Sequence, residues 1–169
     1  MLNLEKTLTV INDLEASGLI RKYAIGGAIG LLFHAEPVTT YDLDIFCFLP
    51  PSLGPVITLT PISDELKKRG YVEDKEHILI EGLPVQMLPA YNALVVEAVE
   101  NALEITYHAV PTRVFRLEHL LAIMVQTGRP KDKARLLDVI DQVQPELAFL
   151  GGILMRHGLI AQWEEWVNA

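Results

Sequence analysis

The sequence predicts a mixed α/β (α+β) fold in which a β-sheet flanked by helices is followed by an all-helical region. Residues 43–49 form a nearly continuous apolar run, which is typical of a central strand covered on both faces. From residue 117 onward, apolar residues recur only at helical spacing. We therefore expect an α/β core over residues 1–115 and a helical region packed on it over residues 116–169.

Apolar spacing and the residues that interrupt it set the expected elements of the first half. The expected helices cover residues 4–14, 28–33, 61–69 and 92–103, and the expected strands cover residues 23–25, 43–49, 71–81, 84–88 and 105–110. Gly18 and Gly70 are stop signals for two of these helices, and Pro61 suits the first turn of the third. Pro50 and Pro51 end the long apolar strand, because proline cannot donate a hydrogen bond to a neighbouring strand.

The second half contains only helical patterns. The expected helices cover residues 117–127, 131–143, 145–157 and 160–167. Trp163 and Trp166 in the last of them are interpreted as helix-packing residues or as contacts in a homo-oligomer. We find no internal repeat and no low-complexity linker along the chain.

Composition excludes several classes of function. The formal net charge is -8 and the sequence pI is about 5.1, whereas non-specific nucleic-acid binding requires a broad basic surface. The global charge therefore argues against such binding but still allows a local basic patch. The single cysteine, Cys47, lies in an apolar run and is expected to be a buried structural thiol. Residues 1–6 lack the pattern of a signal peptide, and no apolar run reaches the roughly 18 residues of a membrane span. We expect a soluble cytoplasmic protein without membrane contacts.

Asp42 and Asp44 are the first candidates for chemistry. They are two residues apart at the start of the predicted strand, so both carboxylates point to the same face of the sheet. Two like charges beside an apolar core repel each other, and a divalent cation would remove that cost. Mg²⁺ typically takes one or two carboxylates together with phosphate oxygens and water. The pair therefore suits a Mg²⁺–triphosphate site.

Gly26 and Gly27 are candidates for holding phosphate. Glycine permits unusual φ values and a close approach of the backbone to a ligand, and the start of the following helix offers free N–H groups. The alternative is that the pair forms only a tight turn between a strand and a helix. Fourteen residues separate Gly27 from Asp42, and the two motifs in this order are more specific than either one alone.

Together these motifs resemble the signature of the DNA-polymerase-β-like nucleotidyltransferase superfamily. In that superfamily a hydrophobic-Gly-Gly/Ser turn precedes an Asp-x-Asp pair on the next strand, as in Ile25-Gly26-Gly27 and Asp42-Leu43-Asp44 here. The chain most resembles the minimal and AbiEii-like toxin-type branches. In these, a later segment reads roughly Glu-x-Leu-hydrophobic-Ala and then Arg-x-Lys-Asp, to which residues 118–122 and 129–132 are similar. The resemblance covers about residues 20–140.

The resemblance implies a nucleotidyltransferase core. Such a protein binds a nucleoside triphosphate and transfers its nucleoside monophosphate to a hydroxyl group of an acceptor, here a small molecule, a protein side chain or an RNA end. It implies that Gly26 and Gly27 hold phosphate. It also implies that Asp42 and Asp44 ligate two Mg²⁺ ions and are the catalytic carboxylates.

Three positions depart from the pattern of these relatives. Gln86 stands where the superfamily usually has a third carboxylate, Met124 where AbiEii-like proteins tend to have lysine, and Arg135 where they tend to have aspartate. An amide oxygen can contact Mg²⁺, but it brings no charge and cannot act as a base. Binding of the metal that activates the acceptor is therefore weakened, unless Glu81 substitutes for the missing acid.

Several interpretations stay open at the level of sequence. Arg129 and Lys131 either reach the triphosphate or acceptor or belong to a solvated helix face. Asp42 could cap a helix or a turn, and Asp44 could be an ion-pair partner. A further alternative is an unrelated α/β structural domain. The leading function is Mg²⁺-dependent nucleotidyl transfer. The alternative is a catalytically degenerate protein of the same fold that binds a nucleotide or a partner protein, as in toxin–antitoxin or regulatory systems.

Overall fold

The computed structural model describes residues 3–35, 42–51 and 58–168. The strands are β1 (Lys22–Gly26), β2 (Leu43–Phe48), β3 (Val72–Asp74), β4 (His77–Ile80), β5 (Leu83–Pro89), β6 (Leu103–Tyr107) and β7 (Val110–Val114). The helices are α1 (Leu4–Ala16), α2 (Gly27–Leu32), α3 (Thr60–Lys68), α4 (Ala93–Glu100), α5 (Leu117–Thr127), α6 (Pro130–Gln142), α7 (Leu147–Arg156) and α8 (Ile160–Val167). The described strands form one mixed sheet in the order β3-β4-β5-β2-β1-β7-β6. This architecture confirms the predicted mixed α/β fold.

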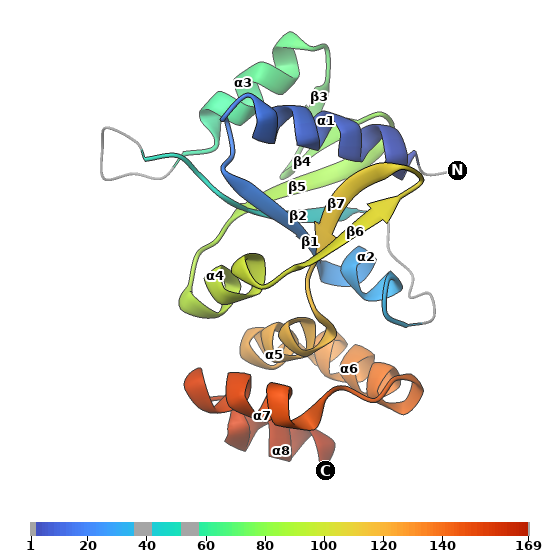
Figure 1. Cartoon of the computed structure of the whole chain (residues 1–169), viewed down its shortest axis with the longest axis vertical. Coiled ribbons are helices and arrows are strands. Elements are labelled where there is room, and N and C mark those ends of the chain that lie inside the picture. The colour runs from blue at the N-terminus through green and yellow to red at the C-terminus, as the bar shows by residue number, and fades with distance from the viewer. Residues whose placement is uncertain (1–2, 36–41, 52–57, 169) are drawn as a thin grey trace.

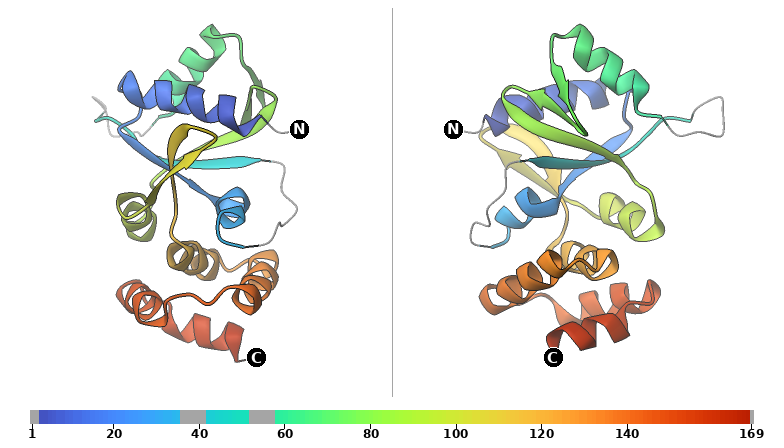
Figure 2. Two further views of the ribbon diagram at one scale, coloured as in Figure 1. Left: turned by 45° about the vertical axis from the view of Figure 1, so that its right-hand side comes forward. Right: turned by 180° about the vertical axis from the view of Figure 1, so that it is seen from behind.

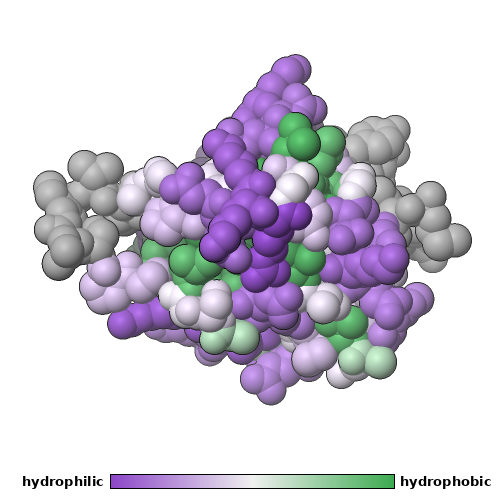
Figure 3. Space-filling view, turned by 90° about the horizontal axis from the view of Figure 1, so that it is seen from above, coloured by the Kyte–Doolittle hydropathy of each residue, from purple (hydrophilic) through white to green (hydrophobic). Residues whose placement is uncertain are grey.

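The helices form layers on the two faces of the sheet. Helices α1 and α3 cover one face, and α2 and α4 lie on the other (Figures 1 and 2). Helices α5 and α6 follow below α2 and α4, and α7 and α8 are farthest from the sheet. Seen from the side of α1 and α3, the surface is mostly hydrophilic, with small separate hydrophobic patches (Figure 3). These two helices therefore turn their polar faces to solvent and their apolar faces to the sheet.

The centre of the sheet explains the apolar run in the sequence. Strand β2 pairs antiparallel with β1 and parallel with β5. Ile45 and Cys47 pack into the hydrophobic cluster on the α1/α3 side, and Phe46 packs into the cluster on the helical side. Cys47 is fully buried, as expected, and burial raises the pKa of its thiol to about 12. A strand covered on both faces has to be apolar at nearly every position.

Two hairpins replace elements that the sequence predicts as single strands. Residues 71–81 contain β3 and β4, and the segment predicted as a strand at 105–110 belongs to the hairpin of β6 and β7. The turns use Lys75 (φ 59°), His108 (φ 46°) and Ala109 (φ 69°). Left-handed turn conformations are normally recognised from glycine or asparagine. These turns therefore carry no sequence signal.

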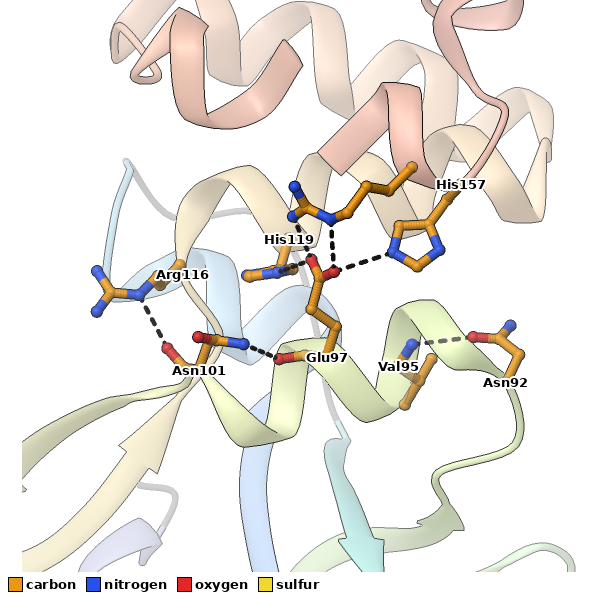
Figure 4. A network of polar contacts seen from close by, with 8 residues as sticks. Asn92, Val95, Glu97, Asn101, Arg116, His119 and His157 are labelled. Atoms are coloured by element: carbon orange, nitrogen blue, oxygen red, sulfur yellow. Dashed lines mark hydrogen bonds and ion pairs between the residues drawn. The ribbon is translucent and has the colours of Figure 1, made fainter. Parts of the chain in front are cut away.

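A polar network joins the sheet-bearing part of the chain to its last helices. Glu97 of α4 accepts hydrogen bonds from Nε2 of His119 at 2.8 Å, from Arg156 at 3.0 and 3.1 Å, and from Nε2 of His157 at 3.2 Å (Figure 4). His119 lies on α5, and the other two donors lie at the end of α7. One side chain therefore connects three helices.

The hydrophobic cluster on the helical side also crosses residue 116. It contains Ala24 and Phe46 from the sheet together with Leu121, Leu136 and Trp166 from the later helices. The division into units at residues 115 and 116 stays a prediction. Within the described ranges, no helix is both long enough and apolar enough to cross a membrane.

Candidate functional site

An open cleft of about 550 Å³ lies between the helical face of the sheet and the helices α5 and α6. All of the predicted site residues except Gly26 line it, namely Gly27, Asp42, Asp44, Gln86, Arg129 and Lys131. These residues come from four separate segments of the chain, and the fold brings them together. The volume falls within the range of about 300–1,000 Å³ that is usual for small-molecule sites.

Strand register explains how the floor of the cleft is built. Asp44 lies opposite Gly26 on β1 and opposite Gln86 on β5. Gly26, Asp44 and Gln86 therefore form one row across the three central strands. Alternation along β2 turns the Asp44 side chain to the same face as Phe46, which is the helical face. The polar residues at the start of this apolar strand therefore lie at the cleft.

The glycine pair has a steric reason for its composition. Gly27 has φ 59°, and a Cβ atom there would collide with the carboxylate of Asp44. A Cβ atom on Gly26 would lie 2.6 Å from the ring of Phe46 and 2.8 Å from that of Phe115. Gly27 therefore makes room for the Asp44 carboxylate at the cleft, whereas Gly26 lies against aromatic rings. A phosphate-holding role for both glycines stays a prediction.

The environment of Asp44 is unfavourable to a negative charge. Burial and the neighbouring charge of Asp42 raise the Asp44 pKa to about 6, although His77, Arg129 and Lys131 act in the opposite direction. Its Oδ1 atom is buried and has no hydrogen-bond partner in the described part of the chain. A buried carboxylate oxygen without a partner is uncommon in folded proteins. It is the kind of atom that a bound cation would satisfy.

Asp42 has a neighbour that the sequence does not suggest. Nε2 of His77, the first residue of β4, lies 3.1 Å from Oδ2 of Asp42. His77 and the adjacent Glu76 both line the cleft. Their position follows from the β3–β4 hairpin, whose turn the sequence does not show.

The basic side of the cleft comes from the start of α6. Arg129 donates two hydrogen bonds to Asp132, from Nε at 2.7 Å and from a terminal nitrogen at 3.2 Å. Asp132 is buried, so it holds the Arg129 guanidinium at the cleft. Lys131 and Arg135 line the cleft as well. Because Arg129 and Lys131 both lower the Asp44 pKa, their charges act at the same place as the carboxylate pair.

Gln86, at the position where the resemblance leads us to expect a third carboxylate, lies directly beside Asp44. Glu81 cannot replace it, because Glu81 accepts a hydrogen bond of 2.9 Å from the hydroxyl of Tyr71 and does not line the cleft. In residues 3–35, 42–51 and 58–168, no group of three or more His, Cys, Asp or Glu side chains could hold a metal ion by itself. Two carboxylates can still hold Mg²⁺ when phosphate oxygens complete its coordination.

Comparison with known proteins identifies the fold. No protein-family model matches the chain, and no curated protein matches it. Solved structures do match, among them that of an antigenic nucleotidyltransferase-like protein from Paracoccidioides brasiliensis. The identity is 15% and the TM-score 0.55, over 80% of this chain and 74% of that chain. The chain therefore has a nucleotidyltransferase-like fold, and its assignment to the AbiEii-like branch stays a prediction.

Proposed function

We propose that the chain is a Mg²⁺-dependent nucleotidyltransferase. It binds a nucleoside triphosphate in the cleft and transfers the nucleoside monophosphate to a hydroxyl group of a small molecule, a protein or an RNA end. The observation that carries this proposal is the convergence of the Asp42/Asp44 pair with Arg129 and Lys131 in one open cleft. Opposite charges on facing walls suit a ligand that consists of a polyphosphate and its cation.

The residues present fit one Mg²⁺ ion bound together with a triphosphate. Asp42 and Asp44 would supply oxygen ligands, and Oδ1 of Asp44, which has no hydrogen-bond partner in the described part of the chain, would be available to a cation. When bound, Mg²⁺ neutralises this pair and withdraws charge from the phosphate oxygens. Arg129, oriented by Asp132, and Lys131 bind the remaining phosphate charge from the opposite wall. The chain thereby orients the triphosphate across the cleft.

A second function is favoured by Gln86. Because an amide lies beside Asp44, no third carboxylate among the described residues is grouped with Asp42 and Asp44 to hold a second cation, although Glu76 also lines the cleft. A protein with this site would bind the Mg²⁺–nucleotide without transferring it, and would act through a partner protein in a toxin–antitoxin or regulatory system. Both functions use the same cleft, and they differ in whether pyrophosphate is released.

Titration calorimetry of the four nucleoside triphosphates with Mg²⁺ tests the binding that both functions share. We expect binding to the wild type that disappears in Asp42→Asn/Asp44→Asn. The matched control is Asp138→Asn/Asp141→Asn, which removes two exposed carboxylates of α6 that do not line the cleft. Absence of binding by the well-folded wild type would overturn both functions.

Pyrophosphate release separates transfer from binding alone. Protein loaded with the triphosphate that binds is supplied in turn with small-molecule, protein and RNA fractions. A transferase releases pyrophosphate with one of these fractions, and Gln86→Asp increases the rate because it restores a carboxylate beside Asp44. If the wild type and Gln86→Asp both bind the nucleotide but release none, the binding function holds.

A further inference from the structure

The cleft has two chemically different parts. Its polar part contains Asp42, Asp44, His77, Gln86, Arg129 and Lys131. Its apolar part contains Phe46, Leu88, Tyr91, Leu120, Ile123 and Met124. Phosphates and a cation account for the polar part, but they give no reason for an apolar wall in the same cleft.

The two parts follow each other along the same strands. Phe46 lies two residues beyond Asp44 on β2, and Leu88 lies two residues beyond Gln86 on β5, with Phe46 and Leu88 paired in register. A strand rises about 3.3 Å per residue, so the apolar part begins roughly 7 Å from the carboxylate row. A ligand held by its phosphates at Asp44 would extend over this wall with its other end.

Tyr91 is the most exposed aromatic residue of the apolar part. Tyr91 is 59% exposed, and its ring centroid lies 6.5 Å from that of Phe46. Burial and the charge of Asp44 raise the Tyr91 pKa, while the charge of Arg129 lowers it, so the phenol is within electrostatic range of both walls. A large, mostly exposed aromatic side chain therefore lines the cleft together with the carboxylate pair and the basic side.

The backbone on both sides of Tyr91 is fixed. The N–H of Ala90 donates to the carbonyl of Cys47 at 2.9 Å and prolongs the pairing of β5 with β2. The side chain of Asn92 accepts from the N–H of Val95 at 2.9 Å and donates to Gln126 of α5 at 2.8 Å. Tyr91 is thus presented from a rigid connection, which reduces the entropic cost of stacking against a ligand.

We infer that Tyr91 stacks on the nucleobase of the bound triphosphate, with Phe46 and Leu88 forming the surface beneath the sugar and base. This inference rests on the proposed function and assigns the part of the cleft that the phosphates do not use. Stacking is tolerant of base identity, because every base has a π-face. We therefore expect all four nucleoside triphosphates to gain affinity from Tyr91 by a similar factor.

The test compares a nucleoside triphosphate with inorganic tripolyphosphate, which has the same phosphates and no base. With Mg²⁺ present, the wild type should bind the nucleotide more tightly than tripolyphosphate. Tyr91→Ala should weaken binding of the nucleotide by roughly 5- to 150-fold, which is the range for loss of one base–aromatic stack, and should leave binding of tripolyphosphate unchanged. Tyr91→Phe should retain the wild-type affinity for both ligands.

The controls separate this inference from the proposed function. Asp44→Asn should weaken the binding of both ligands equally. Tyr71→Ala, which changes a tyrosine outside the cleft, should weaken the binding of neither. If Tyr91→Ala binds the nucleotide as tightly as the wild type does, the inference is wrong and the proposed function stands. If the wild type binds neither ligand, the proposed function fails and the inference fails with it. Loss of tripolyphosphate binding in Tyr91→Ala would also overturn the inference, since Tyr91 would then act on the phosphates.

Discussion

At the scale of single residues, the proposed role of Asp44 in ligand binding conflicts with the folding stability of the protein. Its pKa of about 6 in the folded protein exceeds the ordinary value of 3.8, so the folded state holds its proton more tightly than the unfolded state does. Folding stability therefore falls as the pH rises from about 4 to above 6, because the buried carboxylate becomes charged. A residue that destabilises the fold at neutral pH and faces a cleft is a candidate for function.

We predict that Asp44→Asn stabilises the metal-free protein at pH 7 by about 1–3 kcal/mol, since a neutral amide removes the buried charge. The gain should nearly vanish at pH 4, where Asp44 of the wild type is itself protonated. Urea unfolding at the two pH values with a chelator present measures both free energies. Asp138→Asn, at an exposed position on α6, should change neither. A gain that is equal at both pH values would contradict the assigned cause.

The sequence contains the local part of the site and not the part that depends on folding. Asp42, Asp44 and the glycine pair are recognisable from their order and spacing along one segment, and the β1–β2 register then brings them together. Tyr91 and His77 lack such a signal, because their positions depend on the β5–β2 register and on a hairpin turn.

At the scale of elements, the helices are predicted more completely than the sheet. Each expected helix is present, with ends shifted by a few residues, because spacing and stop signals act locally. The two missed hairpins turn at residues that are not typical of turns, among them His108 and Ala109, both with positive φ. Long-range pairing in the sheet selects this conformation and overrides the local preference.

The β6–β7 turn offers a test of that explanation. Ala109 has φ 69°, a conformation that costs an L-residue with a Cβ atom roughly 1–2 kcal/mol and costs glycine little. We predict that Ala109→Gly raises the free energy of unfolding by about 0.5–1 kcal/mol, after subtraction of the entropy that glycine loses on folding. The matched control is Ala134→Gly at an exposed position inside α6, which should lower it by about 1 kcal/mol. Equal destabilisation by both changes in urea unfolding would refute the prediction.

At the scale of the whole molecule, Glu97 connects the sheet-bearing part to the last helices. Burial alone would raise its pKa, but hydrogen bonds from Arg156, His119 and His157 outweigh this and lower the pKa to about 2. Stability from this network is therefore fully present above about pH 4.5 and is lost as the pH falls toward 2. His119 is completely buried, and burial lowers its pKa, so its neutral imidazole donates from Nε2 to Glu97, while its buried Nδ1 has no hydrogen-bond partner among the described residues.

We predict that Glu97→Gln destabilises the protein by about 1–2 kcal/mol at pH 7, a figure discounted for the partial exposure of the network to solvent. The difference from wild type should shrink at pH 3, where the wild-type carboxylate has lost part of its advantage. Glu100→Gln, at an exposed position on the last turn of the same helix, should have little effect at either pH. Urea unfolding of the three proteins at both pH values supplies the comparison. A difference that persists unchanged at pH 3 would show that charge is not its source.

The shared hydrophobic cluster and the Glu97 network together predict one cooperative unfolding transition. Two kinds of side chain report separately on the two ends of the molecule. Both tryptophans, Trp163 and Trp166, lie on α8, and the single cysteine, Cys47, is buried in β2. In a urea titration, tryptophan fluorescence should therefore give the same midpoint as chemical labelling of Cys47, and Glu97→Gln should lower both midpoints together. If the fluorescence changed at a lower urea concentration, the last helices would unfold while the sheet stays intact. The last helices would then be a separately folding unit, because they would not depend on the sheet for their stability.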